Sequence, residues 1–204
     1  SFVGADNAPR ANLFTGGAGN DSFAGGTDTF TLLHYTAEVD SMGGFQGITA
    51  NFSGVTQGPV ANGTIIDAFG DTDTATDIDM VRGTSFADTI YLGGATRIFS
   101  GHAGADIING FVGGNDLVND NDIVLYDEDA GHGGGAGVFV DLGAGTATDG
   151  FGDTDTLVDI ESVEGTSFDE VLIGSAEDNV LNGGPGGGND TLRGDAGNDQ
   201  IMGG

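Results

Sequence analysis

Residues 194–202 have the sequence Gly-Asp-Ala-Gly-Asn-Asp-Gln-Ile-Met, which follows the pattern G-x-x-G-x-D-x-U-x, where U is a large apolar residue. The same pattern occurs at residues 16–24 and 101–109. Glycine adopts the positive φ angles of tight turns, so we expect the first six residues of each unit to turn. The apolar residue then anchors a very short strand, and recurrence of the unit predicts a solenoid of stacked coils.

The apolar positions of these units keep a nine-residue spacing along much of the chain. They form the series Phe14 and Phe23; Ile90, Phe99 and Ile108; Leu172 and Leu181; and Leu192 and Ile201. The step from Leu181 to Leu192 is longer because residues 185–188 carry two extra residues. If two units make one coil, neighbouring coils lie about 4.8 Å apart, which is the usual strand spacing. Asp88 and Asp106, separated by two units, would then lie side by side.

A longer repeat accompanies the short one. The hexapeptide Phe-Gly-Asp-Thr-Asp-Thr occurs at residues 69–74 and again at 151–156, and Gly-Thr-Ser-Phe follows both copies. We therefore expect a first β-roll unit over residues 1–94, a second over 95–175, and the start of a third, truncated block over 176–204. The expected fold is all-β. It is a parallel β-roll or β-helix-like solenoid of nonapeptide repeats, with irregular inserted coils and almost no helix.

The composition limits the possible partners. The chain of 204 residues has 32 acidic and 4 basic residues, a formal charge of −28, which argues against binding nucleic acid or an anionic membrane surface. With no cysteine, neither disulfides nor thiolate sites can staple this glycine-rich chain, whereas oxygen ligands for a hard cation are plentiful. No apolar run approaches the roughly 20 residues that span a bilayer, so we expect no membrane insertion.

The nonapeptides resemble the repeat-in-toxin (RTX), or haemolysin-type, calcium-binding repeats of bacterial exported proteins. The clearest matches are residues 16–24, 101–109, 187–193 and 194–202, with weaker ones at 83–91 and 165–173. The resemblance implies that several Ca²⁺ ions bind between turns on adjacent coils. Each ion would be held by the sixth-position side chains of two turns and by backbone carbonyls of both.

Carried over residue by residue, the resemblance implies three sites, each formed by two turns. The first would join Thr84, Phe86 and Asp88 to Gly101, Ala103 and Asp106. The second would join Ser175, Glu177 and Asn179 to Gly194, Ala196 and Asp199. The third would join Thr166, Phe168 and Glu170 to Gly183, Pro185 and Asp190, and Asp21 is a further candidate ligand.

Some positions depart from the repeat pattern. Asn179 brings no charge, Glu170 is one methylene longer than Asp, and the insertion at residues 185–188 alters the spacing of the turn carbonyls. These departures weaken the second and third sites. Arg97 stands where the turn that begins at Gly93 should have its acid, so no ion is expected there.

Other polar residues leave alternatives open or favour a simple surface role. Asp71-Thr72-Asp73 and its repeat at residues 153–155 are equally compatible with ion-binding loops and with solvated turn acids. The acids that follow Asn119 indicate a solvated face, namely Asp120, Asp122, Asp127 and Asp129. Three scattered histidines, His34, His102 and His132, form no zinc motif, and His102 is expected to be exposed in its turn.

These observations favour a calcium-binding module of a secreted bacterial protein that folds on calcium after export, attached to another domain of a longer chain. The alternative is a self-associating extracellular protein, a fibre, surface-layer or adhesin segment, whose coils stack end to end. Either would be secreted, extracellular or on the cell surface. With no HExxH or GxSxG motif, the sequence predicts that the protein is not an enzyme.

Overall fold

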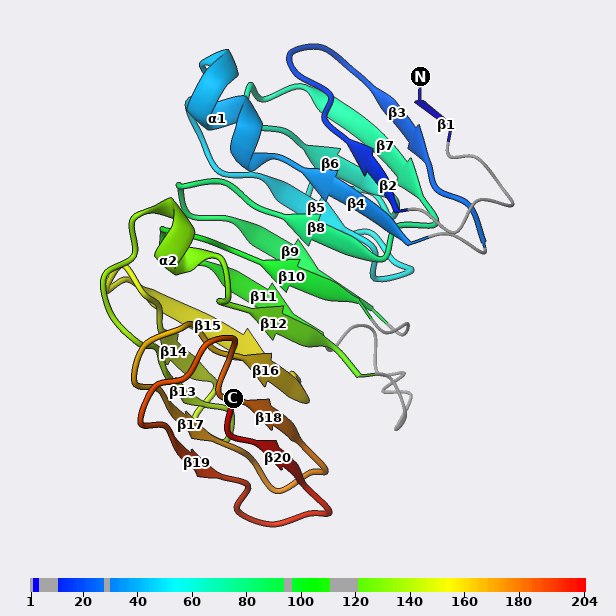
Figure 1. The fold of residues 1–204 in the computed structure, drawn as a ribbon. Helices are drawn as coiled ribbons and strands as arrows, with labels where there is room; N and C mark the ends of the chain where they lie inside the picture. Colours follow the sequence, from blue (N-terminus) through cyan, green and yellow to red (C-terminus); the bar gives the residue numbers. More distant parts are fainter. Residues whose placement is uncertain (1, 4–10, 28–29, 94–96, 111–120) are drawn as a thin grey trace.

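The protein is described from a computed structural model, which places residues 2–3, 11–27, 30–93, 97–110 and 121–204 (Figure 1). These residues form many short strands and two short helices. In chain order the elements are β1 (Phe2–Val3), β2 (Asn12–Phe14), β3 (Ser22–Ala24), β4 (Thr31–His34), α1 (Thr36–Met42), β5 (Thr49–Asn51), β6 (Thr64–Ile66), β7 (Thr72–Thr76), β8 (Met80–Arg82), β9 (Thr89–Tyr91), β10 (Ile98–Ser100), β11 (Ile107–Asn109), β12 (Ile123–Leu125), α2 (Asp129–His132), β13 (Phe139–Asp141), β14 (Thr146–Thr148), β15 (Thr154–Val158), β16 (Ser162–Glu164), β17 (Val171–Ile173), β18 (Val180–Asn182), β19 (Thr191–Arg193) and β20 (Gln200–Met202).

The strands form two sheets that face each other across a narrow core. One sheet has the order β1-β3-β7-β6-β5-β9-β11-β15-β14-β13-β17-β19, and the other has the order β2-β4-β8-β10-β12-β16-β18-β20. Successive coils pair in parallel, with Ile90 opposite Ile108 in the first sheet and Val81 opposite Phe99 in the second. This arrangement confirms the predicted parallel β-roll. In both sheets, strands on either side of the predicted unit boundaries pair with each other, and the division into three units stays a prediction.

The apolar residues of the nonapeptides line the core, as their spacing predicts. Six of them, Phe23, Ile90, Phe99, Ile108, Leu172 and Leu181, are at most 2% exposed. Phe14 and Leu192 are partly buried at the margin of this core, and the ring of Phe14 lies 5.8 Å from that of Phe23. Ile201 is exposed on β20, the last strand of its sheet in the described residues, which pairs with β18.

The long repeat corresponds to a hairpin inserted in the first sheet. In one copy β5, β6 and β7 are linked by antiparallel pairing through β6, and in the other β13, β14 and β15 are linked through β14. The inserted segments are therefore more regular than the irregular coils that we predicted. Because each hairpin turns the chain back, β7 pairs with the earlier strand β3 and β15 pairs with β11.

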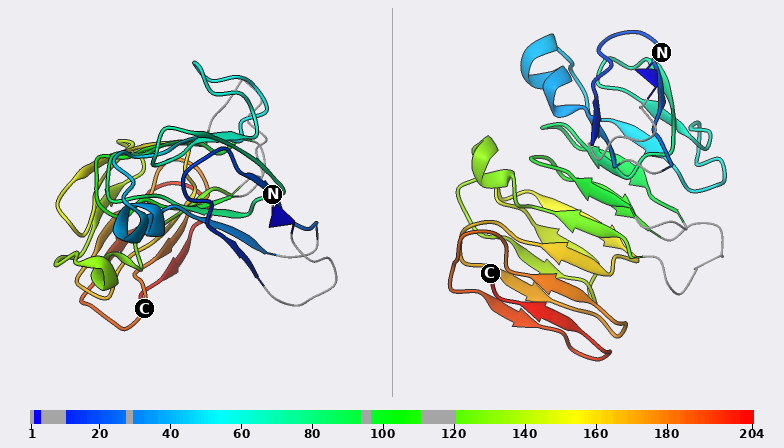
Figure 2. Two further views of the ribbon diagram at one scale, coloured as in Figure 1. Left: turned by 90° about the horizontal axis from the view of Figure 1, so that it is seen from above. Right: turned by 45° about the vertical axis from the view of Figure 1, so that its right-hand side comes forward.

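Both helices lie at one edge of the roll, where the chain passes from the second sheet to the first (Figures 1 and 2). Each is followed by a glycine with positive φ, Gly43 at 87° and Gly133 at 107°, which ends the helix in the left-handed region. The scarcity of helix agrees with the prediction. Neither helix in the described residues has the length and apolar character needed to cross a membrane.

Truncation of the buried Phe99 should destabilise the roll strongly, because its ring is fully enclosed between the two sheets. Phe99→Ala is expected to lower the free energy of unfolding by about 3–5 kcal/mol. Phe139→Ala, which removes a ring that is 46% exposed, is the matched control and should change it by about 0.5 kcal/mol or less. Urea unfolding at a fixed calcium concentration measures both. Equal losses in the two variants would contradict the core described above.

Candidate metal centre

The first predicted pair of turns meets at the edge that carries the helices. Turn 83–88 precedes β9 and turn 101–106 precedes β11, and pairing of these strands brings the turns together. The backbone N–H of Asp88 donates a hydrogen bond to Oδ1 of Asp106 over 2.8 Å. Both aspartates are 1% exposed. The structure thus places the two turns side by side, with the backbone amide of Asp88 on the carboxylate of Asp106, and the binding of one ion by both side chains stays a prediction.

The two aspartates differ in how their oxygens are satisfied. Oδ2 of Asp88 accepts from the backbone N–H of Thr84 over 2.7 Å, and its Oδ1 accepts from the N–H of Ile48 over 2.7 Å. Oδ2 of Asp106 is buried and has no hydrogen-bond partner among the described residues. Burial raises the pKa of both carboxyls, and the charges of Asp88 and Asp155 raise that of Asp106 further. A buried carboxylate oxygen that accepts no hydrogen bond can be satisfied by a bound cation instead.

Glycines allow these turns to approach so closely. A Cβ on Gly101 would lie 1.9 Å from Oδ2 of Asp106, so no larger residue fits at the first position of the turn. Gly104 has φ of +117°, and a Cβ there would lie 2.7 Å from the carbonyl oxygen of Phe86. The predicted carbonyl ligand Phe86 therefore faces the neighbouring turn. Ala103 and Thr84 belong to the same two turns, and Thr84 is buried.

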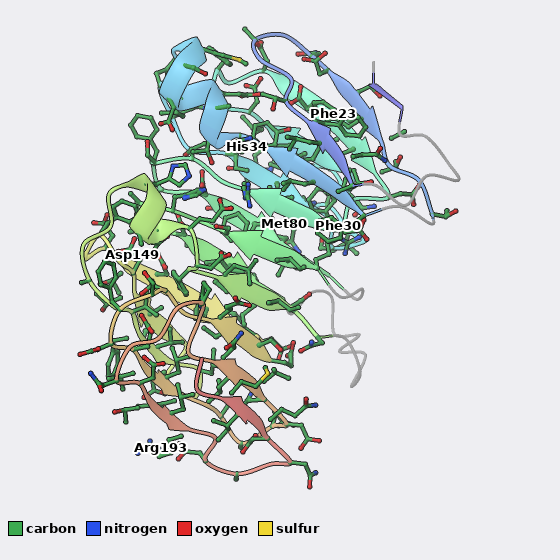
Figure 3. The ribbon with its side chains drawn as sticks, in the orientation of Figure 1. Phe23, Phe30, His34, Met80, Asp149 and Arg193 are labelled. Atoms are coloured by element: carbon green, nitrogen blue, oxygen red, sulfur yellow. The ribbon has the colours of Figure 1, made fainter. Side chains whose placement is uncertain are left out.

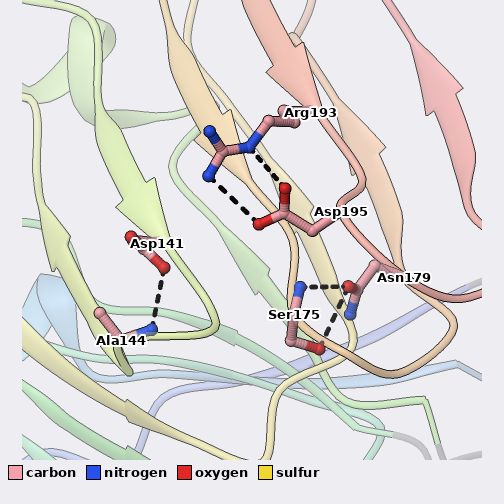
Figure 4. A network of polar contacts seen from close by, with 6 residues as sticks. All are labelled: Asp141, Ala144, Ser175, Asn179, Arg193 and Asp195. Carbon is pink, nitrogen blue, oxygen red and sulfur yellow. Dashed lines mark hydrogen bonds and ion pairs between the residues drawn. The ribbon is translucent and has the colours of Figure 1, made fainter.

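The second predicted pair also meets, at the opposite edge of the roll. The backbone N–H of Asn179 donates to Oδ1 of Asp199 over 3.0 Å. Oδ1 of Asn179 accepts from the N–H of Ser175 over 2.6 Å, so the amide closes its own turn (Figure 4). A Cβ on Gly194 would lie 2.1 Å from Oδ2 of Asp199, whereas Glu177 and Ala196 are exposed in the two turns.

The third predicted pair meets in the same way. The backbone N–H of Glu170 donates to Oδ1 of Asp190 over 3.0 Å, and the hydroxyl of Thr166 donates to the Glu170 carboxylate. Oε2 of Glu170 and Oδ2 of Asp190 are buried without a hydrogen-bond partner among the described residues. Burial raises the pKa of Glu170.

The longer turn of the third pair keeps the contact despite its two extra residues. A Cβ on Gly188 would lie 1.8 Å from the carbonyl oxygen of Phe168, and one on Gly183 would lie 2.2 Å from Oδ2 of Asp190. The added residues bulge outward, since Pro185 is exposed. The insertion therefore leaves the predicted neighbours in place.

Asp21 and Asp106 each contact an aspartate of the repeated hexapeptide. The N–H of Asp21 donates to Oδ1 of Asp73 over 2.8 Å, and the N–H of Asp106 donates to Oδ1 of Asp155 over 3.0 Å. Asp73 and Asp155 are at most 2% exposed, so the alternative of solvated turn acids is wrong for both. The exact repetition of residues 69–74 was the signal that could have found them.

Asp21 and Asp106 each belong to a larger group of acids, defined here as acid cluster 1 and acid cluster 2, whose members are buried except for the half-buried Asp21. Cluster 1 consists of Asp21, Glu38, Asp67 and Asp73, and cluster 2 consists of Asp106, Asp129, Asp149 and Asp155. In both, a helix supplies one acid, Glu38 from α1 or Asp129 from α2. Asp149 lies at the edge that carries α2 (Figure 3). The clusters are equivalent places in the two long repeats.

In several of these acids, hydrogen bonds fix one carboxylate oxygen and leave the other without a partner in the described residues. Glu38 Oε1 accepts from the N–H of Gly17 over 2.9 Å, and Asp129 Oδ2 accepts from the N–H of Gly150 over 3.0 Å. The remaining oxygens have no hydrogen-bond partner among the described residues, although they are buried: Glu38 Oε2, Asp67 Oδ2, Asp129 Oδ1 and Asp149 Oδ2. Tyr35 and Tyr126 donate to the aspartate oxygens of Asp73 and Asp155 over 2.9 Å in each case.

Burial raises the pKa of these carboxyls well above the ordinary range. The pKa is about 7 for Glu38, Asp129 and Asp155, and about 6 for Asp73, with desolvation as the main cause in every case. Asp129 and Asp122 are buried, so the prediction that they form a solvated face is wrong; Asp120 lies outside the described residues. The sequence suggested a solvated surface because these acids do not recur at a regular spacing from buried apolar residues.

Arg97 occupies an acid position in the opposite edge of the roll. Its backbone N–H donates to Oδ1 of Asp122 over 3.1 Å, and its guanidinium lies 5.2 Å from the centre of the Phe52 ring. Burial lowers the pKa of Arg97, while the charges of Asp122 and Asp79 oppose this effect. The arginine thus supplies a positive charge between two acids. This placement supports the expectation of no ion at that turn.

The comparison with protein families agrees with this geometry. The RTX calcium-binding nonapeptide repeat matches the chain in four copies, at residues 10–29, 73–108 and 164–201. These ranges include every predicted turn pair. No curated protein matches the chain. RTX repeats are typical of secreted bacterial proteins. The chain therefore carries RTX calcium-binding nonapeptide repeats in three regions, folded as a parallel β-roll.

Proposed function

We propose that the chain is the calcium-dependent folding module of a secreted bacterial protein, with Ca²⁺ bound at the three turn pairs and in the two acid clusters. The observation that supports it, at every place except the second turn pair, is the set of buried carboxylate oxygens without a hydrogen-bond partner in the described residues. Calcium takes six to eight oxygen ligands, and carboxylates together with turn carbonyls supply them. The module has no catalytic role in this proposal.

Charge repulsion makes folding depend on the ion. Two carboxylates about 4 Å apart repel by about 1 kcal/mol in water and about 4 kcal/mol at an effective dielectric of about 20. A site with a dissociation constant of about 10⁻⁴–10⁻³ M, usual for extracellular modules, would stay empty at cytoplasmic calcium. Calcium in tenfold excess over that constant adds about 1.4 kcal/mol of stability per site. The chain would therefore stay unfolded before export and fold outside the cell.

Removal of calcium should unfold the roll. Circular dichroism of the chain in millimolar calcium is expected to show a β signal that disappears with chelator and returns with added calcium, while magnesium restores it poorly. Calorimetric titration would give the number of ions. An identical β signal with chelator and with calcium would overturn the proposal. Light scattering that rises with protein concentration in calcium would instead favour the self-associating structural alternative.

Removal of one shared carboxylate should weaken calcium-induced folding. Asp106 contacts Asp88 on one side and Asp155 on the other, so Asp106→Asn takes a charge from two neighbouring sites. The calcium concentration at the folding midpoint is expected to rise by about tenfold or more, which corresponds to about 1.4 kcal/mol. Asp40→Asn removes the same charge from an exposed position of α1 and should leave the midpoint unchanged. Equal shifts in both variants would indicate a general charge effect instead.

The raised pKa values predict how stability depends on pH. Between about pH 4 and about pH 7 the folded, calcium-free chain holds protons on Glu38, Asp129 and Asp155 that the unfolded chain has lost. Its stability should therefore fall as the pH rises through this range. With saturating calcium the order reverses, because protons compete with the ion for the same oxygens. The β signal in chelator at about pH 5 and about pH 7.5, together with urea midpoints in saturating calcium at the same two pH values, tests this. A β signal in chelator that grows with pH would contradict it.

A further inference from the structure

Two histidines that are far apart in the sequence meet beside α2. His102 lies in the turn after β10, and His132 is the last residue of α2. Their ring centres are 4.4 Å apart, with the rings tilted by 58°. Glu128 immediately precedes α2, and one ligand atom from each of the three side chains lies within 4.8 Å of the others. We call His102, Glu128 and His132 the histidine cluster.

His102 is the unusual member of this cluster. The sequence predicted an exposed side chain, but the residue is 2% exposed, so that prediction was wrong. Neither Nδ1 nor Nε2 has a hydrogen-bond partner within the described part of the chain. A neutral imidazole has one donor and one acceptor, and leaving both buried without partners costs free energy. A bound metal ion would satisfy one of these nitrogens directly.

The backbone conformation of His102 is also unusual. Its φ is +63°, a left-handed value that is uncommon for a residue with a Cβ. The second position of the equivalent turn at residues 16–21 is Gly17, with φ of +80°. A histidine in this place is therefore less favourable than glycine for the turn itself. Residues held in strained backbone conformations cluster at functional sites, which favours a ligand-binding role for the His102 side chain.

The surroundings fit a transition metal better than calcium. Arg82 on β8 forms an ion pair with Glu128, which holds the carboxylate in place. His34 on β4 lies opposite Arg82 in the strand pairing, and its pKa is lowered by burial and then by the charges of Arg82 and His132. Two imidazole nitrogens and one carboxylate oxygen form a set that Zn²⁺ accepts, with a fourth position left for water, whereas Ca²⁺ prefers oxygen throughout.

Access also suits an ion from solution. Glu128 is half-buried and His132 is exposed, so the cluster opens to solvent on one side while His102 forms its buried wall.

We infer that the histidine cluster is a binding site for a divalent transition metal, best matched by Zn²⁺, distinct from the calcium sites. His102 and His132 bind through one ring nitrogen each, and Glu128 binds through a carboxylate oxygen. The ion would link α2 to turn 101–106.

The test is zinc binding by the full chain in saturating calcium, measured by competition with a chromophoric chelator. One Zn²⁺ per chain is expected. His102→Gly is the decisive variant, because glycine suits the positive φ and should keep the turn folded. It is expected to weaken zinc binding by at least about 10–100-fold, because in metalloproteins the loss of a residue that only hydrogen-bonds a metal ligand already has an effect of that size. His132→Ala should do the same.

His34→Ala is the matched control and should bind Zn²⁺ as the unchanged chain does. Thermal unfolding in calcium gives a second measurement. Added zinc should raise the midpoint of the unchanged chain and of His34→Ala, but not that of His102→Gly. Zinc binding that is absent, that survives His102→Gly, or that falls equally in all three histidine variants would overturn the inference. A lower midpoint of His102→Gly without zinc would show that the histidine serves the fold instead.

Discussion

Successive coils of this protein are joined by a hydrogen bond from a backbone N–H to the carboxylate of the next coil. Asp88 donates to Asp106, Asp106 donates to Asp155, and at the opposite edge Asn179 donates to Asp199. This contact satisfies a buried amide. Where both residues are acids, as with Asp88 and Asp106, it also places their negative charges on neighbouring strands, about 4.8 Å apart. The bond that builds the roll therefore creates the repulsion that a cation must relieve.

The inserted hairpins extend this rule rather than interrupt it. Because each hairpin turns the chain back, Asp73 or Asp155 of the repeated hexapeptide lies next to a nonapeptide turn. The helix that precedes the hairpin adds a further acid, Glu38 or Asp129. A buried tyrosine, Tyr35 or Tyr126, then fixes the aspartate by donating to its second oxygen. The duplication thus made two equivalent acid clusters, each of which combines one nonapeptide aspartate, Asp21 or Asp106, with three acids from an inserted segment. The inserted segments therefore supply most of the acids in both clusters.

The sequence was sufficient for the roll, the core and the pairing of the turns, because residues one coil apart in a regular repeat become neighbours in space. Asp88 and Asp106 are 18 residues apart, which is the predicted coil length, and the contacts of the other two pairs span 20 residues because of the two-residue insertion. Acid cluster contacts join residues 52 or 49 apart, and these separations depend on the length of the hairpins. No period in the sequence predicts these separations. The contact between His102 and His132 was not predictable for the same reason, since α2 lies within an inserted segment.

The chain has too few basic residues to neutralise its acids, so the remaining positive charge must come from solution. Among the described arginines, Arg82 pairs with Glu128, Arg193 pairs with Asp195 near the surface, and Arg97 lies between acids of the edge opposite the helices. None of these pairs involves the acids of clusters 1 and 2. Because the chain has no lysine and 32 acids, its own side chains cannot neutralise the helix-bearing edge. That edge is stable as folded only if protons or metal ions from solution supply the positive charge, and above about pH 7 protons no longer suffice.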